Sequence, residues 1–401
     1  MFDLPLWKRN LIICWIGSFS TLIGIYLVVP FLPLYISQLG VQSLPEIEKW
    51  SGYTLGAPAL VGMFTMPLWG KLSDRYGCKP MLLRASLGMA VTMFAMGFVR
   101  DVYQLLFLRL LMGGVMGFVP AAITMVASQT PKEKTGWALA TLSTGSVSGA
   151  LVGPLIGGVL SDLLGLRPVF FCTGVCLFLA FLVTLWGIHE EFVPKKEVSQ
   201  SNRPLWKTIA RPQVLIAIFL TTSMLQLATM SIQPILTIYV EQLMQRPSHI
   251  SMVAGAVFAA TGVANILIAP SLGRLSDRIG SHKVLRACLI LSALTIIPQA
   301  FVHTVWQLTF LRFLFGLTAA GLMPSINTMI RKNVPSHSAG AVYGYNSTFS
   351  NLGSLSGPIL GGHIAAAFGI PAVFFSTSLL LLLNAFWVFS TKTSYELSAS
   401  K

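Results

Sequence analysis

Long apolar stretches follow one another along almost the whole of this 401-residue chain, and short polar turns separate them. About twelve of these stretches hold about 20 residues or more, the length at which an α-helix crosses a bilayer. Helices are required because backbone groups that face lipid have no water to bond. The predicted spans are residues 10–37, 52–70, 80–99, 102–127, 136–160 and 168–188, followed by 213–241, 251–272, 284–302, 305–330, 338–362 and 371–391.

Only one long polar segment interrupts this pattern, from His189 to Pro212, and it separates the sixth predicted span from the seventh. It divides the chain into a six-helix bundle at 1–188, a cytoplasmic linker at 189–212, and a second six-helix bundle with a short cytoplasmic tail at 213–401. The other loops are too short to form a soluble catalytic or nucleotide-binding domain. The sequence also lacks a Walker A motif, which argues against ATP hydrolysis.

The two halves share a sequence pattern. Gly-Lys-Leu-Ser-Asp-Arg-Tyr-Gly at 70–77 returns as Gly-Arg-Leu-Ser-Asp-Arg-Ile-Gly at 273–280, which is 203 residues later. Gly153-Pro154 returns 204 residues later as Gly357-Pro358. A nearly constant offset at several sites predicts a duplicated fold: an all-α membrane protein with twelve transmembrane helices in two pseudo-symmetric bundles.

Composition and charge agree with a membrane protein. Hydrophobic residues make up 54% of the chain, charged residues 10%, and the mean hydropathy is +0.73, whereas soluble domains are about 25% charged. If the amino terminus is cytoplasmic, twenty-one Lys and Arg residues, Arg84 among them, lie on that side. Four lie on the opposite side: Lys49, Arg100, Arg167 and Arg246. This positive-inside bias predicts two cytoplasmic termini and explains the net charge of +14 without nucleic-acid binding.

Chemistry-bearing residues are rare inside the spans. All thirteen acidic residues lie in loops or at predicted helix ends, so no span offers a carboxylate at the bilayer midplane. No nucleophile–base pair or metal cluster is visible, and the five cysteines are interpreted as packing residues. The chain is therefore predicted not to be an enzyme and to hold no metal or cofactor.

These motifs resemble those of the major facilitator superfamily of secondary transporters, over essentially the whole chain. The 70–79 segment resembles the family's signature loop between helices 2 and 3, which acts as a conformational switch. Asp74 is expected to pair with a cation or a helix amino terminus. The resemblance assigns the switch to Gly70, Asp74, Arg75, Gly77 and Lys79, and in the second copy to Gly273, Asp277 and Arg278.

A second resemblance concerns Arg109, within Leu105 to Gly114, which is similar to the family's helix 4 motif; Arg312 occupies the matching place in the second half. In the family this Arg is proposed to assist proton transfer, so Arg109 and Asp74 are the proton-coupling candidates. The alternative is a structural Arg that bonds backbone carbonyls.

A third resemblance lies in the fifth span, where glycines four residues apart predict a flat strip along one helix face. The strip resembles the antiporter motif of drug-exporting branches of the family; the alternative is a general packing seam. Its residues are Gly145, Gly149, Gly153, Pro154, Gly157 and Gly158.

Substrate contacts are expected from the first, fourth, seventh and tenth spans, which line the cavity in this fold, with a possible addition from the eleventh. Ordinary helix packing is the alternative for each candidate. The candidates are Tyr26, Tyr35, Gln226, Thr229, Gln233, Tyr239, Asn327 and Asn346.

Taken with the resemblance, the sequence predicts a monomeric transporter of the bacterial inner membrane, surrounded by lipids, that exports amphipathic small molecules by alternating access in exchange for protons. One alternative is a carrier of a defined metabolite such as a sugar. A receptor that binds without transporting is the least favoured class, because a static receptor needs no paired conformational switch.

Overall fold

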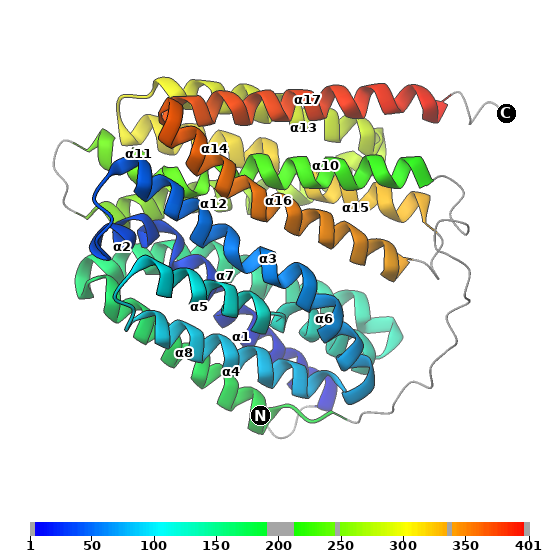
Figure 1. The fold of residues 1–401 in the computed structure, drawn as a ribbon. Coiled ribbons are helices and arrows are strands. Elements are labelled where there is room, and N and C mark those ends of the chain that lie inside the picture. Colours follow the sequence, from blue (N-terminus) through cyan, green and yellow to red (C-terminus); the bar gives the residue numbers. More distant parts are fainter. Residues whose placement is uncertain (1–4, 191–211, 245–248, 335–338, 397–401) are drawn as a thin grey trace. The chain divides into compact units, whose positions relative to one another are not determined.

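The computed structural model describes residues 5–190, 212–244, 249–334 and 339–396, and every regular element in these ranges is helical (Figure 1). The first half of the sequence forms α1 (Leu6–Leu27), α2 (Leu32–Gln38), α3 (Leu44–Tyr76), α4 (Cys78–Met96), α5 (Val102–Val115), α6 (Phe118–Gln129), α7 (Thr135–Leu164) and α8 (Leu166–Gly187). The second half forms α10 (Pro212–Ser231), α11 (Gln233–Leu243), α12 (Ile250–Ile279), α13 (Ser281–Ile296), α14 (Val305–Ala319), α15 (Leu322–Asn333), α16 (Ala339–Phe368) and α17 (Ile370–Glu396).

The all-helical class is confirmed. Nine helices or runs of consecutive helices among the described residues are long and apolar enough to cross a membrane. The predicted spans 52–70, 80–99 and 338–362 coincide with α3, α4 and α16, which are not among those nine. A count of twelve is compatible with this arrangement.

Several predicted spans are built from two helices. α1 and α2 are joined by a 3-10 turn that contains Pro30, and α11 follows α10 with Pro234 in its first turn. Proline has no amide hydrogen, so it interrupts the helical ladder and is tolerated where a new helix begins. The equivalent interruptions at Pro30 and Pro234 show that the duplication extends to the local backbone.

The described residues fall into two compact units. One lies within residues 1–41, 57–198 and 248–256, and the other within 42–56, 199–247 and 257–401. Each unit therefore includes one short segment from the other half of the sequence. In the first unit α7 packs along α1 and α8 along α4; in the second, α16 packs along α10 and α17 along α13. These pairs correspond to each other under the repeat.

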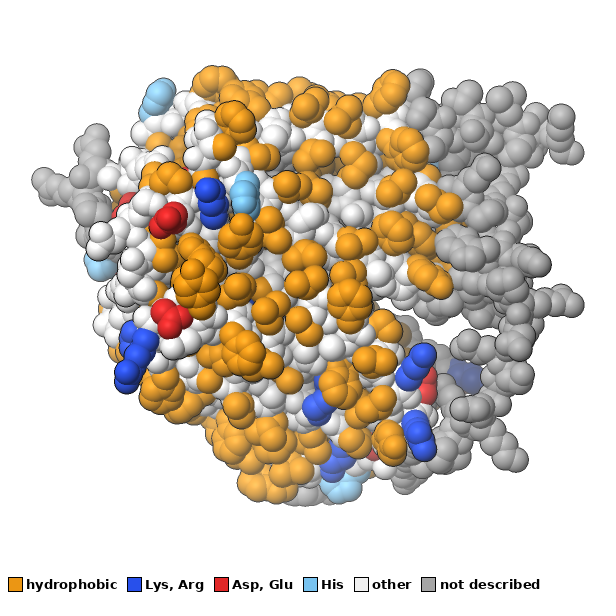
Figure 2. All heavy atoms as spheres, viewed as in Figure 1, with side chains coloured by type: hydrophobic (Ala, Val, Ile, Leu, Met, Phe, Trp, Pro, Cys, Tyr) orange, Lys and Arg blue, Asp and Glu red, His pale blue; other side chains and the backbone are white. Residues whose placement is uncertain are grey.

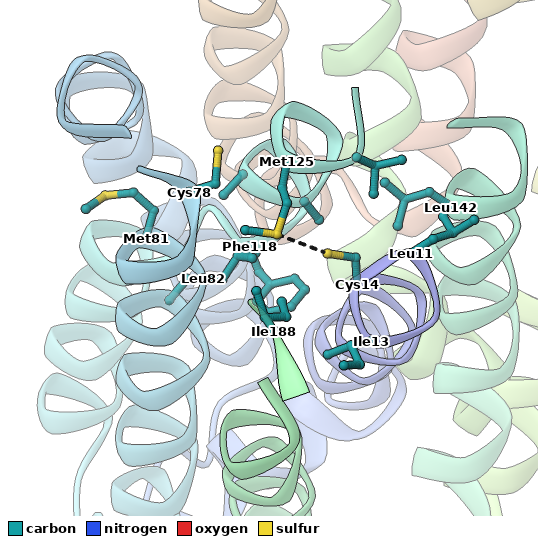
Figure 3. Packing of buried hydrophobic residues seen from close by; sticks show 14 of the residues in the cluster. Leu11, Ile13, Cys14, Cys78, Met81, Leu82, Phe118, Met125, Leu142 and Ile188 are labelled. Atoms are coloured by element: carbon teal, nitrogen blue, oxygen red, sulfur yellow. Dashed lines mark hydrogen bonds between the residues drawn. The ribbon is translucent and has the colours of Figure 1, made fainter. Parts of the chain in front are cut away.

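The first unit has a sulfur-rich apolar core formed by α1, α4, α6 and α7 together with Ile188 (Figure 3). Cys14 of α1 points toward Met125 of α6, with 3.9 Å between the sulfur atoms. Leu82 and Phe118 are almost fully buried in the same cluster. Since thioethers and thiols are polarisable and adaptable, they fill the irregular space between these helices.

The outer surface is apolar as well. Hydrophobic side chains are spread over the described part of the face shown in Figure 2, and few charged side chains lie among them. Phe64, Phe107 and Trp306 are each at least 60% exposed. Soluble monomers rarely expose so many large apolar side chains, whereas a surface in contact with acyl chains requires them.

Candidate functional site

At the turn between α3 and α4, the first amides of α4 are hydrogen-bonded by the carboxylate of Glu190, a distant residue of the first unit. Gly77 has φ of 92°, a conformation that favours glycine. Glu190 accepts hydrogen bonds from the backbone amides of Cys78 at 2.8 Å and Lys79 at 2.6 Å. These amides begin α4 and have no partner within the helix, and the positive end of the helix dipole favours an anion there.

The polar pattern of the sequence places Glu190 in the predicted linker at 189–212 and does not indicate this role. Asp74, which is expected to pair with a cation or a helix amino terminus, is exposed, and the carboxylate at the amino terminus of α4 is that of Glu190. Only the folded chain brings residue 190 to residue 78, and no local signal in the sequence marks the pairing.

The other residues of the predicted switch are less closely packed than Gly77. Apart from the adjoining backbone of their own helices, no atom of the described residues lies within 4 Å of the place where a Cβ on Gly70 or Gly273 would lie. The side chains of Arg75 and Arg278 are exposed, and Lys79 is half-buried. The side chain of Asp277 lies outside the described residues.

Arg109 lies on α5 with 3% of its surface exposed, and its Nε and Nη2 have no hydrogen-bond partner among the described residues. Arg312 occupies the equivalent place on α14, is 5% exposed, and has an unpartnered Nε. A guanidinium in an apolar interior is costly and marks a functional site by default. Both arginines retain unused hydrogen-bond donors.

The fourth predicted span is broken just after Arg109. α5 ends at Val115, Gly117 has φ of 132°, and α6 begins at Phe118. Such a break leaves the last carbonyls of α5 without helical donors. Side chains from α3 and α4 supply them instead.

Three hydrogen bonds brace this break. Thr65 Oγ1 donates to the Gly113 carbonyl at 3.3 Å, Trp69 Nε1 to the Gly114 carbonyl at 2.8 Å, and Arg84 Nη2 to the Met116 carbonyl at 3.4 Å.

Arg84 also stacks on Trp69, with the guanidinium carbon 3.6 Å from the ring centroid. The charge pattern places Arg84 among the cytoplasmic cations, but Arg84 is half-buried and donates to the carbonyl of the residue that follows α5. The charge pattern could not reveal this position because it depends on the break in a neighbouring helix.

The glycine strip of α7 packs directly on the backbone of α1. A Cβ on Gly149 would lie 2.5 Å from the Phe19 carbonyl oxygen, and one on Gly157 would lie 2.0 Å from the Leu27 carbonyl oxygen. Contacts this short require glycine, since real Cβ atoms do not approach so closely. The flat strip predicted from the spacing is therefore present.

The continuation of the strip contacts the segment of α12 that belongs to the same unit. Cβ atoms on Gly158 and Gly255 would each lie 2.3 Å from a carbonyl oxygen, of Ser251 and Pro154 respectively. Asp162 accepts a hydrogen bond from the Met252 amide at 2.9 Å. The motif thus extends beyond the α1–α7 seam.

Several candidate cavity residues meet between α10 and α16. Thr222 Oγ1 donates to Asn346 Oδ1 at 2.8 Å, and Gln226 Nε2 donates to Ser350 Oγ at 3.1 Å. Thr229 lies one turn further along α10 and bonds the Gln226 carbonyl. The structure therefore groups Gln226, Thr229 and Asn346, and it adds Thr222 and Ser350, which were not predicted.

Two predicted aromatic candidates serve the packing of the units. Tyr35 is fully buried and donates to the Met96 carbonyl at 2.8 Å; Tyr239 is buried and donates to the Gln299 carbonyl at 2.9 Å. Each hydroxyl group thus has a carbonyl partner within its own unit. The duplicated tyrosines hold corresponding helices together.

The remaining candidates are dispersed. Tyr26 is half-buried, and its Cβ lies 3.1 Å from the place of a Cβ on Gly153. Gln233 is half-buried at the start of α11, and Asn327 is exposed on α15.

Comparisons with known proteins agree with this architecture. The profile of the Major Facilitator Superfamily matches residues 14–245 and 218–400. Multidrug resistance protein MdtG of Enterobacter lignolyticus is 46% identical over 386 residues, which cover 96% of this chain and 92% of that protein. The protein of the same name from Salmonella dublin is 46% identical over 388 residues, with 96% of both chains covered. That from Dickeya zeae is 45% identical over 382 residues, covering 95% of this chain and 94% of that protein.

Solved structures support the fold. A bacterial homologue of the human lysosomal transporter Spinster, in an inward-facing and occupied conformation, has a TM-score of 0.79 at 13% identity, with 98% of both chains covered. The nucleoside transporter NupG has a TM-score of 0.74 at 15% identity, with 96% of this chain and 99% of that chain covered. At these identities the likeness concerns the fold alone.

Proposed function

Because the chain belongs to the Major Facilitator Superfamily, a family of multi-pass membrane transporters of small molecules, we propose that it exports amphipathic drugs or related compounds. The observation that carries this proposal is the likeness to multidrug resistance proteins at 45–46% identity over nearly the full length of both chains. The glycine strip of α7, which resembles the antiporter motif, supports export over uptake.

The proposed mechanism is alternating access, in which residues 1–188 and 213–401 form two bundles that rock about a central substrate site. The protein would act as a monomer in the bacterial inner membrane, with both termini in the cytoplasm. The strong excess of Lys and Arg on the predicted cytoplasmic side supports this orientation. The signature loops at 70–79 and 273–280 would switch between the two states.

Protons are the proposed counter-substrate. Arg109 and Asp74 are the candidates for coupling, and the unpartnered donors of the buried Arg109 support the first of them. A carboxylate or a substrate group that enters its reach during the cycle would bond these donors, and proton binding to that group would release it. Asp74→Asn is expected to lower transport while membrane insertion stays normal; full turnover in this variant would remove Asp74 from the switch.

The test of the proposal is transport of a fluorescent amphipathic dye into inverted vesicles that contain the purified protein, with and without an imposed pH gradient. Accumulation that collapses with the gradient would support proton-coupled export. Dye accumulation that does not depend on the pH gradient would contradict proton coupling. It would indicate export that is driven by another source of energy.

A defined metabolite such as a sugar is the second candidate substrate. It is favoured by the hydrogen-bonding groups that Thr222, Gln226, Asn346 and Ser350 bring together between α10 and α16. Failure to accumulate any dye of a broad panel, combined with uptake or export of a polyol or sugar, would select this function. Substitution of Gln226 by Leu should then abolish transport, whereas dye export should tolerate it.

A further inference from the structure

The end of α4 and the start of α5 border an open surface groove of about 480 Å³ that the proposed transport mechanism does not use. Its lining is apolar and aromatic except for one amide side chain. The lining residues are Ala95, Phe98, Val99, Tyr103, Gln104, Phe107 and Leu108.

The walls of this groove are exposed but held in place. Phe98, Tyr103 and Phe107 are each at least 60% exposed, so the groove opens to the outside of the helix bundle. Phe98 packs against Phe171 of α8 with 4.8 Å between ring centroids. Tyrosine is enriched at the boundary between acyl chains and headgroups. Tyr103 lies in the first turn of α5, so the groove lies where a lipid crosses that boundary.

Two arginine residues adjoin the groove, one through its guanidinium and the other through its backbone. Arg167 donates from Nη2 to the carbonyl of Val99, a lining residue, at 3.1 Å. Arg100 is exposed and follows Val99 directly, and its amide bonds Oε1 of Gln104, another lining residue, at 3.0 Å. The nearest acid in the chain, Asp101, uses Oδ1 to cap the Gln104 amide at 2.9 Å.

Arginine is rare on the predicted side of the membrane where Arg100 and Arg167 lie. The topology predicted from the sequence leaves four cations on the side opposite the cytoplasm, and Arg100 and Arg167 are two of them. The positive-inside rule disfavours cations on that side of the membrane. The presence of two arginines beside one apolar groove therefore needs an explanation other than topology.

The second half of the chain offers an internal control. It repeats the aromatic residues as Phe301, Trp306 and Phe310, all strongly exposed. His303 and Pro371 stand where the first half has Arg100 and Arg167. Apolar exposure is therefore common to both repeats, and the paired arginines belong to the first repeat alone.

We propose that this groove binds one anionic phospholipid, with an acyl chain along the aromatic wall and the phosphate between Arg100 and Arg167. A guanidinium matches a phosphate by paired hydrogen bonds as well as by charge. The apolar lining supplies the area that an acyl chain covers.

The test is native mass spectrometry of the full-length protein after titration with dioleoyl phosphatidylglycerol or with dioleoyl phosphatidylcholine, which has the same acyl chains. The wild type should bind one phosphatidylglycerol at least roughly tenfold more tightly than phosphatidylcholine. The double variant Arg100→Gln, Arg167→Gln should lose this preference. The matched control Lys49→Gln, Arg246→Gln removes two charges from the same predicted side and should keep it.

Two further arms separate a lipid from a simple anion. Ala95→Phe fills the groove and leaves both arginines in place. It should therefore weaken the binding of both phosphatidylglycerol and phosphatidylcholine. Millimolar inorganic phosphate should not displace the bound phosphatidylglycerol. Displacement by phosphate, or full phosphatidylglycerol binding by Ala95→Phe, would show an anion site without an acyl chain and overturn the proposal.

The wild-type protein provides a measurement that does not depend on the folding of any variant. Phosphatidylglycerol with a photoactivatable group on its acyl chain should crosslink within residues 95–108. Crosslinks spread equally over residues 298–311, the repeat that lacks both arginines, would overturn the proposal, as would an unchanged lipid preference in the double arginine variant.

Discussion

The carboxylate of Glu190 stands beside the backbone of Gly77: a Cβ on Gly77 would lie 2.8 Å from Glu190 Oε2. The glycine is needed for its φ of 92° and for the close approach of this carboxylate, which then reaches the first amides of α4. The loop between α3 and α4 and the segment that follows α8 are thus held together by this carboxylate.

We predict that Glu190→Ala destabilises the protein by about 1 to 2 kcal/mol, the typical cost of losing a helix amino-terminal cap. Gly77→Ala should destabilise it as well, by strain at positive φ and by contact with Glu190. Because the two residues touch, the double variant should lose less than the sum of the single variants. Thermal unfolding of the four proteins in detergent measures this coupling; strict additivity would contradict it.

Gly157→Ala should impair the protein strongly, because its Cβ would lie 2.0 Å from the carbonyl oxygen of Leu27 and α1 would have to move away from α7. Gly136→Ala is the matched control on the same helix, since nothing lies within 4 Å of its Cβ position. This control should be neutral or slightly stabilising, because alanine favours a helix over glycine by up to about 1 kcal/mol. Both the melting temperature and the transport rate should be lower in Gly157→Ala than in Gly136→Ala. Equal values in the two variants would contradict the requirement for glycine where α7 packs on α1.

Trp69→Phe keeps an aromatic ring but removes the donor to the Gly114 carbonyl. The net loss of one intramolecular hydrogen bond costs about 0.5 to 1.5 kcal/mol, so we expect lower thermal stability and a less defined break between α5 and α6. Hydrogen exchange at residues 113–117 should increase in this variant. The matched control is Trp50→Phe, because Trp50 lies outside the first unit. This variant should leave hydrogen exchange at residues 113–117 unchanged.

Glu48 predicts a pH dependence. It lies near the start of α3, outside the predicted span 52–70, is 3% exposed, and burial raises the pKa of its carboxyl from 4.5 to about 7. The fold therefore favours the neutral acid. Its stabilising contribution is full below the ordinary pKa of 4.5 and is lost as the pH rises through about 7.

The measurement is the melting temperature between pH 4 and pH 8.5. It should fall across this interval in the wild type and change less in Glu48→Gln, which keeps the shape of the neutral acid. Glu46→Gln, two residues earlier and exposed, should retain the wild-type slope. A wild-type slope in Glu48→Gln would show that other groups cause the dependence.

Arg109→Lys is expected to keep a buried charge but to lose the guanidinium geometry, so dye transport should become insensitive to the pH gradient while protein yield stays normal. The same substitution at Arg312 is the matched control in the second repeat. If both variants lose yield equally and no functional protein is recovered, the arginines are structural, and the coupling role of Arg109 is wrong.

The repeat could be predicted accurately because it depends on local pattern. Residues 70–77 and 273–280 share the same turn chemistry, and Gly77 and Gly280 both adopt positive φ at the start of a helix. Tyr35 and Tyr239 also lie 204 residues apart. Their roles were less evident, since their hydroxyl groups bond carbonyls about 60 residues away.

The roles of individual charges were harder to predict. Arg84 belongs by sequence to the basic residues near the cytoplasm, yet it stacks on Trp69 at the break between α5 and α6. Glu190 belongs by sequence to a polar linker, yet it caps α4. Both assignments depend on a contact between residues far apart in the chain.

The sequence by itself determined the helical class, the duplicated order of the spans and the glycine face of α7, because apolar length, offset and four-residue spacing act within one helix or one repeat. Only the tertiary structure decided which buried polar groups have partners. A hydrogen bond between two helices requires donor and acceptor within about 3 Å, and packing sets that distance. The break at Gly117, the cap at Glu190 and the free donors of Arg109 all depend on that packing.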